Sequence, residues 1–338
     1  DEQAMEDFTR LNNDESRISW TRGLKADLRK GKNAEFDESK IVTTIYRPFF
    51  KQKLYFDRQF NEMVLLTPRL FPSPSEKNIV ISAMGIGASR DFSVLAVNQV
   101  PNLDIVEKAQ CFPLYVYEKS NDEANLFDSG DEGGLTRRDS ITNFTLARYQ
   151  NQYGNELTKE DIFYFVYGLL HSPEYIDRYQ DDLKKMIPRI PLVKNFWGFS
   201  KAGRSLADWH LNYETVEPWE LEGLPPLKAS AASLRVEKMK FAKSAGDHPK
   251  SAIIVNSHYT LAGIPEDAYR YTVNGKSAIE WLIDRYQVKT DKASGILNDP
   301  NLYSDDPRYI IDLVASMVRV SMESVAIIDS LPKLEIIE

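Results

Sequence analysis

Residues Asp161–Tyr175, with the sequence DIFYFVYGLLHSPEY, contain the end of one expected helix and the start of the next. Thr158 and Asp161 have the spacing of a capping box, which predicts that the first helix begins there. The apolar side chains of this helix face almost all directions, and a helix of that kind is normally buried. Ser172 followed by Pro173 is the pattern of an N-cap with proline in the first turn, so a second helix should start there.

The region before this helix pair has the composition of strands. Short apolar or β-branched runs alternate with turns rich in proline and glycine, and they predict strands at 41–46, 53–56, 78–83, 92–97 and 112–117. Their close spacing indicates one compact antiparallel or mixed sheet. After the helix pair, the patterns predict helices at 200–213 and 277–286 and a final helix opened by Asp306-Pro307, with short strands at 236–241, 252–255 and 259–262.

The order of these elements predicts a mixed α+β protein in which a β-rich lobe is followed by a helix-rich α+β lobe. We expect residues 1–35 to form a helical junction, residues 36–140 the β-rich lobe and residues 141–338 the helix-rich lobe. The stretch 120–140 is acidic and contains three glycines, a composition typical of a mobile linker. The lobe boundary is therefore expected there.

The charge of the chain is unevenly distributed. The formal net charge is −8, but phosphate contacts depend on where basic groups gather and not on the total. Residues 17–32 contain six basic side chains and one acidic one, and residues 184–204 contain six basic side chains and no acidic one. This distribution is compatible with a basic cleft on an acidic body. The alternative is that both runs are solvated faces.

Composition places the chain among ordinary globular proteins, with 42% hydrophobic and 27% charged residues. The single cysteine, Cys111, excludes an internal disulfide and favours a reducing compartment, so a cytoplasmic location is expected. The longest apolar-rich segment, residues 309–331, carries four charged side chains, which excludes a membrane span. A first residue other than methionine, Asp1, favours a piece of a longer polypeptide.

The motifs of common catalytic and metal sites are incomplete. The Asn/Asp-Pro-Pro-Tyr/Phe loop of adenine methyltransferases is absent, and Gly275-Lys276-Ser277 lacks the earlier glycine of a phosphate-binding loop, because Arg270 stands there. The four histidines show no metal-ligand spacing, and one cysteine cannot build a zinc site. We therefore expect no active site, no metal and no cofactor in this fragment. The glycine-rich segment 85–90 is expected to be a flexible loop between strands.

Several sequence blocks follow one another along nearly the whole chain: Tyr46–Phe49 with Leu54–Asp57, Gln110–Tyr117, Asp161–Tyr175, Ala202–Asp208, Val273–Ala278, and Tyr286–Lys292 with Asn298–Pro300. In this order they resemble the C-terminal specificity region of Type ISP restriction–modification enzymes. Those are single-chain proteins that join a nuclease, a helicase-like motor, an adenine methyltransferase and a target-recognition domain. Many long blocks in the right order are a specific signal, whereas Tyr46–Phe49 alone would be a weak one.

The resemblance implies a DNA sequence-specificity module. Such a module would position a short asymmetric DNA site for adenine N6-methylation, and for control of ATP-dependent translocation and cleavage by other domains. The expected partners are double-stranded DNA and the N-terminal methyltransferase and helicase domains of the same polypeptide. S-adenosylmethionine, ATP and Mg are implied for the full-length enzyme only.

Reading bases requires planar donor and acceptor groups, and holding phosphates requires cations and small hydroxyls. The candidates around the first sheet are Arg47, Lys51, Lys53, Arg58, Ser82, Ser89, Arg90, Asn98 and Gln99, and those in the second lobe are Lys194, Lys201 and Arg204, with Trp197 nearby. For each of them a structural role is the alternative. The alternative function is a protein-interaction scaffold that packs against the methyltransferase or helicase domains without contacting DNA. A basic cleft would favour DNA reading, and a large apolar patch would favour the scaffold.

Overall fold

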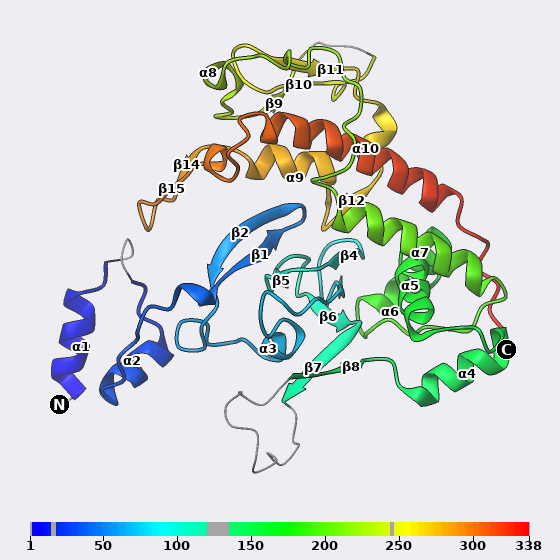
Figure 1. The fold of residues 1–338 in the computed structure, drawn as a ribbon, viewed down its shortest axis with the longest axis horizontal. Helices are drawn as coiled ribbons and strands as arrows, with labels where there is room; N and C mark the ends of the chain where they lie inside the picture. The colour runs from blue at the N-terminus through cyan, green and yellow to red at the C-terminus, as the bar shows by residue number, and fades with distance from the viewer. Residues whose placement is uncertain (1, 15–17, 120–134, 244–246, 338) are drawn as a thin grey trace, which may run out of the picture.

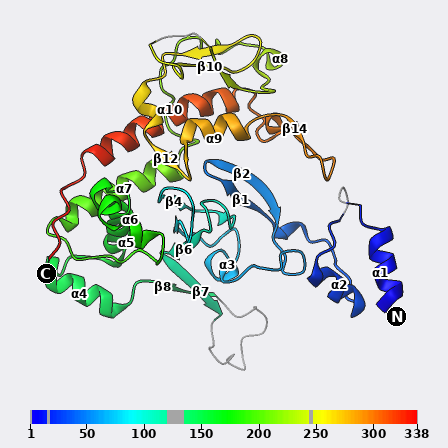
Figure 2. The same ribbon diagram turned by 180° about the vertical axis from the view of Figure 1, so that it is seen from behind.

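The structure is a computed structural model that describes residues 2–14, 18–119, 135–243 and 247–337. Helices and several small sheets alternate along the chain, so the expected mixed α+β class is confirmed (Figure 1). The N-terminal helices lie at one end of the molecule, the strands of residues 41–113 lie in the middle, and a helical group lies at the other end. The view from behind shows the same arrangement (Figure 2).

The N-terminal part contains three α-helices, one short 3-10 helix and most of the longer strands. Its elements are α1 (Glu2–Leu11), α2 (Arg22–Arg29), η1 (Glu38–Lys40), β1 (Ile41–Arg47), β2 (Phe50–Tyr55), α3 (Thr67–Leu70), β3 (Val80–Ala83), β4 (Val94–Val97), β5 (Val100–Pro101), β6 (Gln110–Pro113), β7 (Tyr115–Lys119) and β8 (Leu135–Asp139).

The remaining part is rich in helices and has only short strands. Its elements are α4 (Asn143–Tyr153), α5 (Lys159–Leu169), α6 (Pro173–Leu183), α7 (Phe196–Leu211), α8 (Ala231–Leu234), β9 (Lys240–Phe241), β10 (Ala252–Ile254), β11 (Thr260–Ala262), η2 (Glu266–Tyr269), β12 (Thr272–Val273), β13 (Lys276–Ser277), α9 (Ala278–Arg285), β14 (Lys289–Thr290), β15 (Leu297–Asn298), η3 (Pro300–Leu302) and α10 (Tyr309–Asp329).

The expected single sheet is wrong. The strands form a sheet of order β2-β1-β5, a second sheet of order β4-β3-β6, and a separate β7–β8 ribbon. The run 112–117 divides at Leu114, because its first part pairs with β3 and its second part pairs with β8. Residues 135–139 of the expected linker are that eighth strand. Residues 120–134 of the expected linker lie outside the described residues.

The helix starts agree closely with the capping signals. Thr158 and Asp161 form the capping box of α5, and the Ser172 side chain caps α6 with Pro173 in the first turn. The start of α7 lies earlier than expected, at Phe196, because the Asn195 side chain accepts a hydrogen bond from the Gly198 N–H.

Strands β3 and β4 are buried on both faces. Ile81 and Ala96 belong to one hydrophobic cluster, which α5 and α7 complete, whereas Leu95 and Val97 belong to another, which includes side chains of β1, α9 and α10. Neighbouring residues of a strand point to opposite faces, so burial on both sides explains why β4 is apolar throughout. Both clusters combine residues from before and after the segment 120–134. The lobe limits drawn from the sequence stay predictions.

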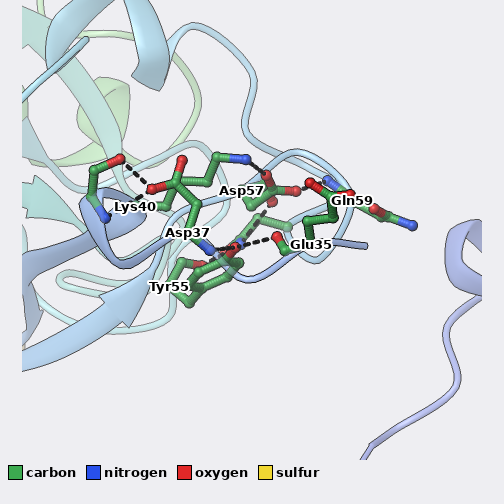
Figure 3. A network of polar contacts seen from close by, with 8 residues as sticks. Glu35, Asp37, Lys40, Tyr55, Asp57 and Gln59 are labelled. Atoms are coloured by element: carbon green, nitrogen blue, oxygen red, sulfur yellow. Dashed lines mark hydrogen bonds and ion pairs between the residues drawn. The ribbon is translucent and has the colours of Figure 1, made fainter. Parts of the chain in front are cut away.

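A network of polar contacts holds the segment before β1 against β2 (Figure 3). The Asp37 N–H donates to the Tyr55 hydroxyl at 3.2 Å, and that hydroxyl donates to the Glu35 carbonyl at 3.3 Å. The Lys40 ammonium pairs with the Asp57 carboxylate at 2.6 Å, and this hydrogen bond is the main cause of the lowered pKa of Asp57. Residues 35–40 are thus attached to the β1–β2 hairpin at several points.

Candidate nucleic-acid interface

A groove of about 600 Å³ lies between the β2-β1-β5 sheet, the β7–β8 ribbon and the segment before β3. We call it the central groove. Its lining includes Thr43 and Lys53 from the first hairpin, Lys77 from the turn before β3, Asn98 and Gln99 from the β4–β5 turn, Tyr115 and Arg137 from the ribbon, and Glu160, Tyr164 and Asn212 from α5 and the end of α7.

The β4–β5 turn presents two side-chain amides to this groove. Asn98 is exposed and Gln99 is half-buried, and neither amide has a hydrogen-bond partner among the residues that the structure describes. Each amide offers both a donor and an acceptor, which is the pattern that pairs with the N6 and N7 edge of adenine. The two side chains are therefore equipped to read a base edge.

The turn itself is fixed from both sides. Before it, the Ala96 N–H donates to the buried Tyr167 hydroxyl at 2.9 Å. After it, the Thr44 hydroxyl donates to the Val100 carbonyl at 2.6 Å, and β5 pairs in parallel with β1. A site held by rigid elements is more precise than one on a free loop.

Cations in the central groove are poorly neutralised. Within the described part of the chain, the Lys53 ammonium has a single polar partner, the Thr43 hydroxyl at 3.3 Å, and the exposed Lys77 ammonium has none. The Arg137 guanidinium lies over the Tyr115 ring at 4.2 Å. These three side chains leave positive charge available for phosphate oxygens.

The two carboxylates of the groove have partners of their own. Glu76 accepts hydrogen bonds from the hydroxyls of Ser73 and Ser75, and these bonds lower its pKa. Glu160 accepts a bond from the Tyr115 hydroxyl at 2.9 Å. Burial, reinforced by this carboxylate, raises the pKa of Tyr115 to about 12. Tyr115 therefore stays protonated near neutral pH and adds no negative charge.

Of the residues predicted from sequence, the structure brings Lys53, Asn98 and Gln99 together in the central groove. Sequence reasoning missed Lys77 and Arg137. Lys77 stands in a proline-rich turn, and Arg137 lies within the acidic stretch 120–140, whose overall negative charge drew attention away from it. The signal for Arg137 was the adjacent pair Arg137-Arg138 before the first helix of the second half.

Arg47 and Lys51 have structural partners. The Arg47 guanidinium donates to the Tyr46 carbonyl at 2.7 Å and to the Asn102 side chain at 3.0 Å. The Lys51 ammonium pairs with the Glu214 carboxylate and lies over the Tyr213 ring. Both side chains connect segments that are distant in sequence.

The prediction that Ser82 reaches a DNA groove is wrong for this fold. Ser82 lies in the middle of the central strand β3 with 0% of its surface exposed, and its hydroxyl contacts the Cys111 sulfur at 3.7 Å. Burial also raises the pKa of the Cys111 thiol, which favours the unreactive protonated form.

The loop that carries Ser89 and Arg90, expected to be flexible, is held in place by hydrogen bonds. The Glu107 carboxylate accepts bonds from the Ser89 N–H, the Ser89 hydroxyl and the Arg90 N–H, all between 3.0 and 3.1 Å. The Arg90 guanidinium donates to the Asn274 carbonyl at 2.8 Å. Asn274 and Gly275 both have positive φ, as a tight type I′ hairpin turn requires. Contact of Ser89 or Arg90 with DNA stays a prediction.

The second-lobe candidates do not line the central groove. Lys194 pairs with Glu335 at 2.7 Å, and Arg204 pairs with Asp161 at 3.1 Å and lies over the Tyr164 ring. Lys201 is exposed, and its ammonium has no partner in the described ranges. The basic run 184–204 is thus partly engaged in internal ion pairs.

Residues 2–14, 18–119, 135–243 and 247–337 hold no group of three or more histidine, cysteine, aspartate or glutamate side chains placed to bind a metal ion. None of the helices described in this structure is both long enough and apolar enough to cross a membrane. His171 and His210 lie in the core beside Tyr167, where burial lowers the pKa of each imidazole. Amides, cations and hydroxyls line the central groove beside its two carboxylates.

Comparison with known proteins gives the family. Residues 1–313 match the model of the Type ISP C-terminal specificity domain. Similar solved structures include the ATP-dependent Type ISP restriction-modification enzyme LlaBIII bound to DNA, at 38% identity, a TM-score of 0.83, and coverage of 95% of this chain and 20% of that chain. No curated protein sequence matches the chain.

Two further solved structures agree. A nuclease-deletion mutant of the Type ISP restriction-modification enzyme LlaGI in complex with a DNA substrate mimic is 39% identical, with a TM-score of 0.80 and coverage of 96% of this chain and 23% of that one. A DrdV–DNA complex is 32% identical, with a TM-score of 0.82 and coverage of 98% and 32%. The chain thus spans between a fifth and a third of the length of these relatives. It belongs to the family of Type ISP C-terminal specificity domains.

Proposed function

We propose that this domain recognises a short asymmetric DNA sequence through the central groove. The observation that carries the proposal is the pair of amides, Asn98 and Gln99, which have no partner in the described ranges and lie on a fixed turn among Lys53, Lys77 and Arg137. The amides would read base edges, and the three cations would hold phosphates and set the register on the duplex. The three solved relatives are described as complexes with DNA or with a DNA substrate mimic, which supports a DNA ligand.

The chemistry of the full-length enzyme belongs to other domains in this proposal. Recognition would present an adenine to a methyltransferase domain of the same polypeptide and would control ATP-dependent translocation and cleavage. S-adenosylmethionine, ATP and Mg would be bound by those domains, and this fragment would contribute no catalytic group. A cytoplasmic location fits the single cysteine and a DNA target.

Selection from random-sequence duplexes tests the proposal. The full-length protein is incubated with the library at low salt and again near physiological salt, and bound DNA is sequenced. Enrichment of one asymmetric motif, with affinity that falls as salt rises, is the expected result. Asn98→Ala together with Gln99→Ala should relax the motif at one or two positions, while the control Lys201→Ala should leave it unchanged. If the amide variants select the same motif as the wild type, the side chains of the central groove do not read the bases and the proposal fails.

A further inference from the structure

The N-terminal end of the molecule exposes an unusual share of large apolar side chains. Of the nineteen exposed in the described part of the chain, eight belong to the first 66 residues, about a fifth of the sequence. We define the N-terminal apolar surface by five of them, which are between 42% and 75% exposed: Phe36, Phe60, Met63, Leu65 and Leu66. A soluble monomer rarely gathers exposed apolar groups in this way, and such gatherings mark interaction sites.

The aromatic part of this surface is held in place. The Phe36 ring, 75% exposed, stacks on the Tyr55 ring with centroids 5.7 Å apart, and Tyr55 meets the edge of Phe60 at 5.8 Å. The Tyr55 hydroxyl is bonded to the backbone on both sides of Phe36, at Glu35 and Asp37 (Figure 3). An exposed side chain that is already fixed loses little entropy when a partner covers it.

The aliphatic part is attached to α2. The Glu62 carboxylate accepts a hydrogen bond from the Gly23 N–H, and a bond from the Thr21 hydroxyl is the main cause of its lowered pKa. Leu65 has a φ of 48°, a left-handed conformation that is uncommon for leucine and needs support from its surroundings. The loop 62–66 is therefore a folded part of the N-terminal end, although Met63, Leu65 and Leu66 are more than 60% exposed.

We propose that the N-terminal apolar surface docks against the polypeptide that precedes this domain in the full-length enzyme. The matched relatives are three to five times longer than the part that this chain covers, and the family is a C-terminal domain. In an enzyme of that length, the upstream polypeptide would be joined to this domain at α1. Both α1 and α2 lie at this same end of the molecule (Figure 1).

The charges around Phe36 indicate the chemistry expected of the surface on the upstream polypeptide that would contact it. Glu35, Asp37 and Glu38 flank the ring in sequence, while the neighbouring Lys40 is neutralised by Asp57. The complementary face is an apolar pocket for the Phe36 ring with basic side chains at its rim. This inference concerns a contact between domains and does not depend on DNA reading by the central groove.

Site-specific photocrosslinking in the full-length enzyme tests the docking. A p-benzoylphenylalanine replaces Phe36 in one variant and Phe144 in the control. Phe144 is also a phenylalanine, is 80% exposed, and lies on α4 at the other end of the molecule (Figure 1). The expected result is a crosslink from position 36 to peptides upstream of this domain in the same polypeptide, and none from position 144 to those peptides.

Two other outcomes would overturn the proposal. Crosslinks between two enzyme molecules would assign the surface to self-association, and the absence of any crosslink from position 36 would leave the surface without a partner. Hydrogen exchange in full-length Phe36→Ser adds a second readout, because faster exchange in the upstream peptides is expected only if the ring covers them. Both measurements are made without DNA, so a failure of the DNA-reading proposal would not affect them.

Discussion

Gly168 of α5 and Gly203 of α7 meet backbone to backbone where the two helices cross. A Cβ atom added at Gly203 would lie 1.9 Å from the Tyr164 carbonyl oxygen and 2.6 Å from the Gly168 nitrogen, and one at Gly168 would lie 2.1 Å from the Phe199 carbonyl oxygen. Two hydrogen atoms thus occupy the positions that methyl groups would need. This close approach sets the distance between α5 and α7. The hydrophobic cluster that these helices form with one face of β4 depends on that distance.

Gly203→Ala should destabilise the domain by about 1–3 kcal/mol or more, since the added methyl group meets backbone atoms and the helices must move apart. The measurement is the free energy of unfolding in urea. Lys201→Ala, on an exposed position of the same helix, is the control and should stay within about 0.5 kcal/mol of the wild type. A Gly203→Ala protein as stable as the control would show that the crossing has room to relax.

Tyr167→Phe should also lower the free energy of unfolding, by about 1–3 kcal/mol. The fully buried Tyr167 hydroxyl accepts from the Ala96 N–H and lies 2.6 Å from the His210 Nδ1 atom, so its removal leaves two buried polar groups unpaired. Tyr164→Phe, on the same helix, is a matched control, because the Tyr164 hydroxyl has no hydrogen bond within the described residues. Equal effects of the two substitutions in calorimetry would contradict this account.

Mild acid should destabilise the domain through His171 and His210. Burial lowers the pKa of His171 to about 4 and that of His210 well below its ordinary value of 6.5. His171 donates to the Tyr167 carbonyl through Nδ1 at 2.9 Å, while its Nε2 is buried and has no partner among the residues that the structure describes. A proton added there would place an unsolvated charge in the core.

The sign of the pH effect follows from these lowered pKa values. Below pH 6.5 the unfolded chain binds protons that the folded chain does not, so the stability present at neutral pH is lost as the pH falls from about 6.5 toward 4. For His171 the loss reaches about 3 kcal/mol, at about 1.4 kcal/mol per pKa unit. Urea unfolding of wild type and His171→Gln at pH 7, 6 and 5 measures it. Parallel pH curves for both proteins would exclude His171 as the cause.

Lys77→Ala and Asn98→Ala should separate the two kinds of contact in the central groove. Lys77→Ala should weaken binding equally for all DNA sequences and lower the slope of log affinity against log salt by about 1, as expected for one lost phosphate contact. Asn98→Ala should cost about 1–3 kcal/mol on the preferred duplex and little on others. Fluorescence anisotropy on preferred and scrambled duplexes measures both. An equal loss of affinity for both duplexes in Asn98→Ala would indicate that this amide contacts the DNA backbone and not a base.

Local sequence patterns were sufficient to predict where α5 and α6 begin. Thr158 and Ser172 cap α5 and α6 as expected, because a cap depends on residues only three positions away. Strand partners could not be predicted in the same way. The run 112–117 looks uniform in sequence, yet it divides between two partners, β3 and β8, that only long-range pairing selects.

The candidate site was predicted only in part for the same reason. Lys53, Asn98 and Gln99 were chosen for their chemistry, and the fold brings them together. Ser82 has suitable chemistry too, but it faces the core. Whether a polar side chain is free depends on partners far away in the chain, as Lys51 shows through its ion pair with Glu214.

The sequence by itself determined the mixed α+β class, the starts of α5 and α6 and, through ordered blocks, the family resemblance, because caps, periodicity and motif order are properties of nearby residues. Only the tertiary structure decided the division of β1–β8 into two sheets and a ribbon, the Gly168–Gly203 contact, the central groove and the exposed N-terminal apolar surface. These features arise where segments distant in sequence come into contact. Which segments pair depends on the contact energy between both partners, and that energy cannot be read from either segment alone.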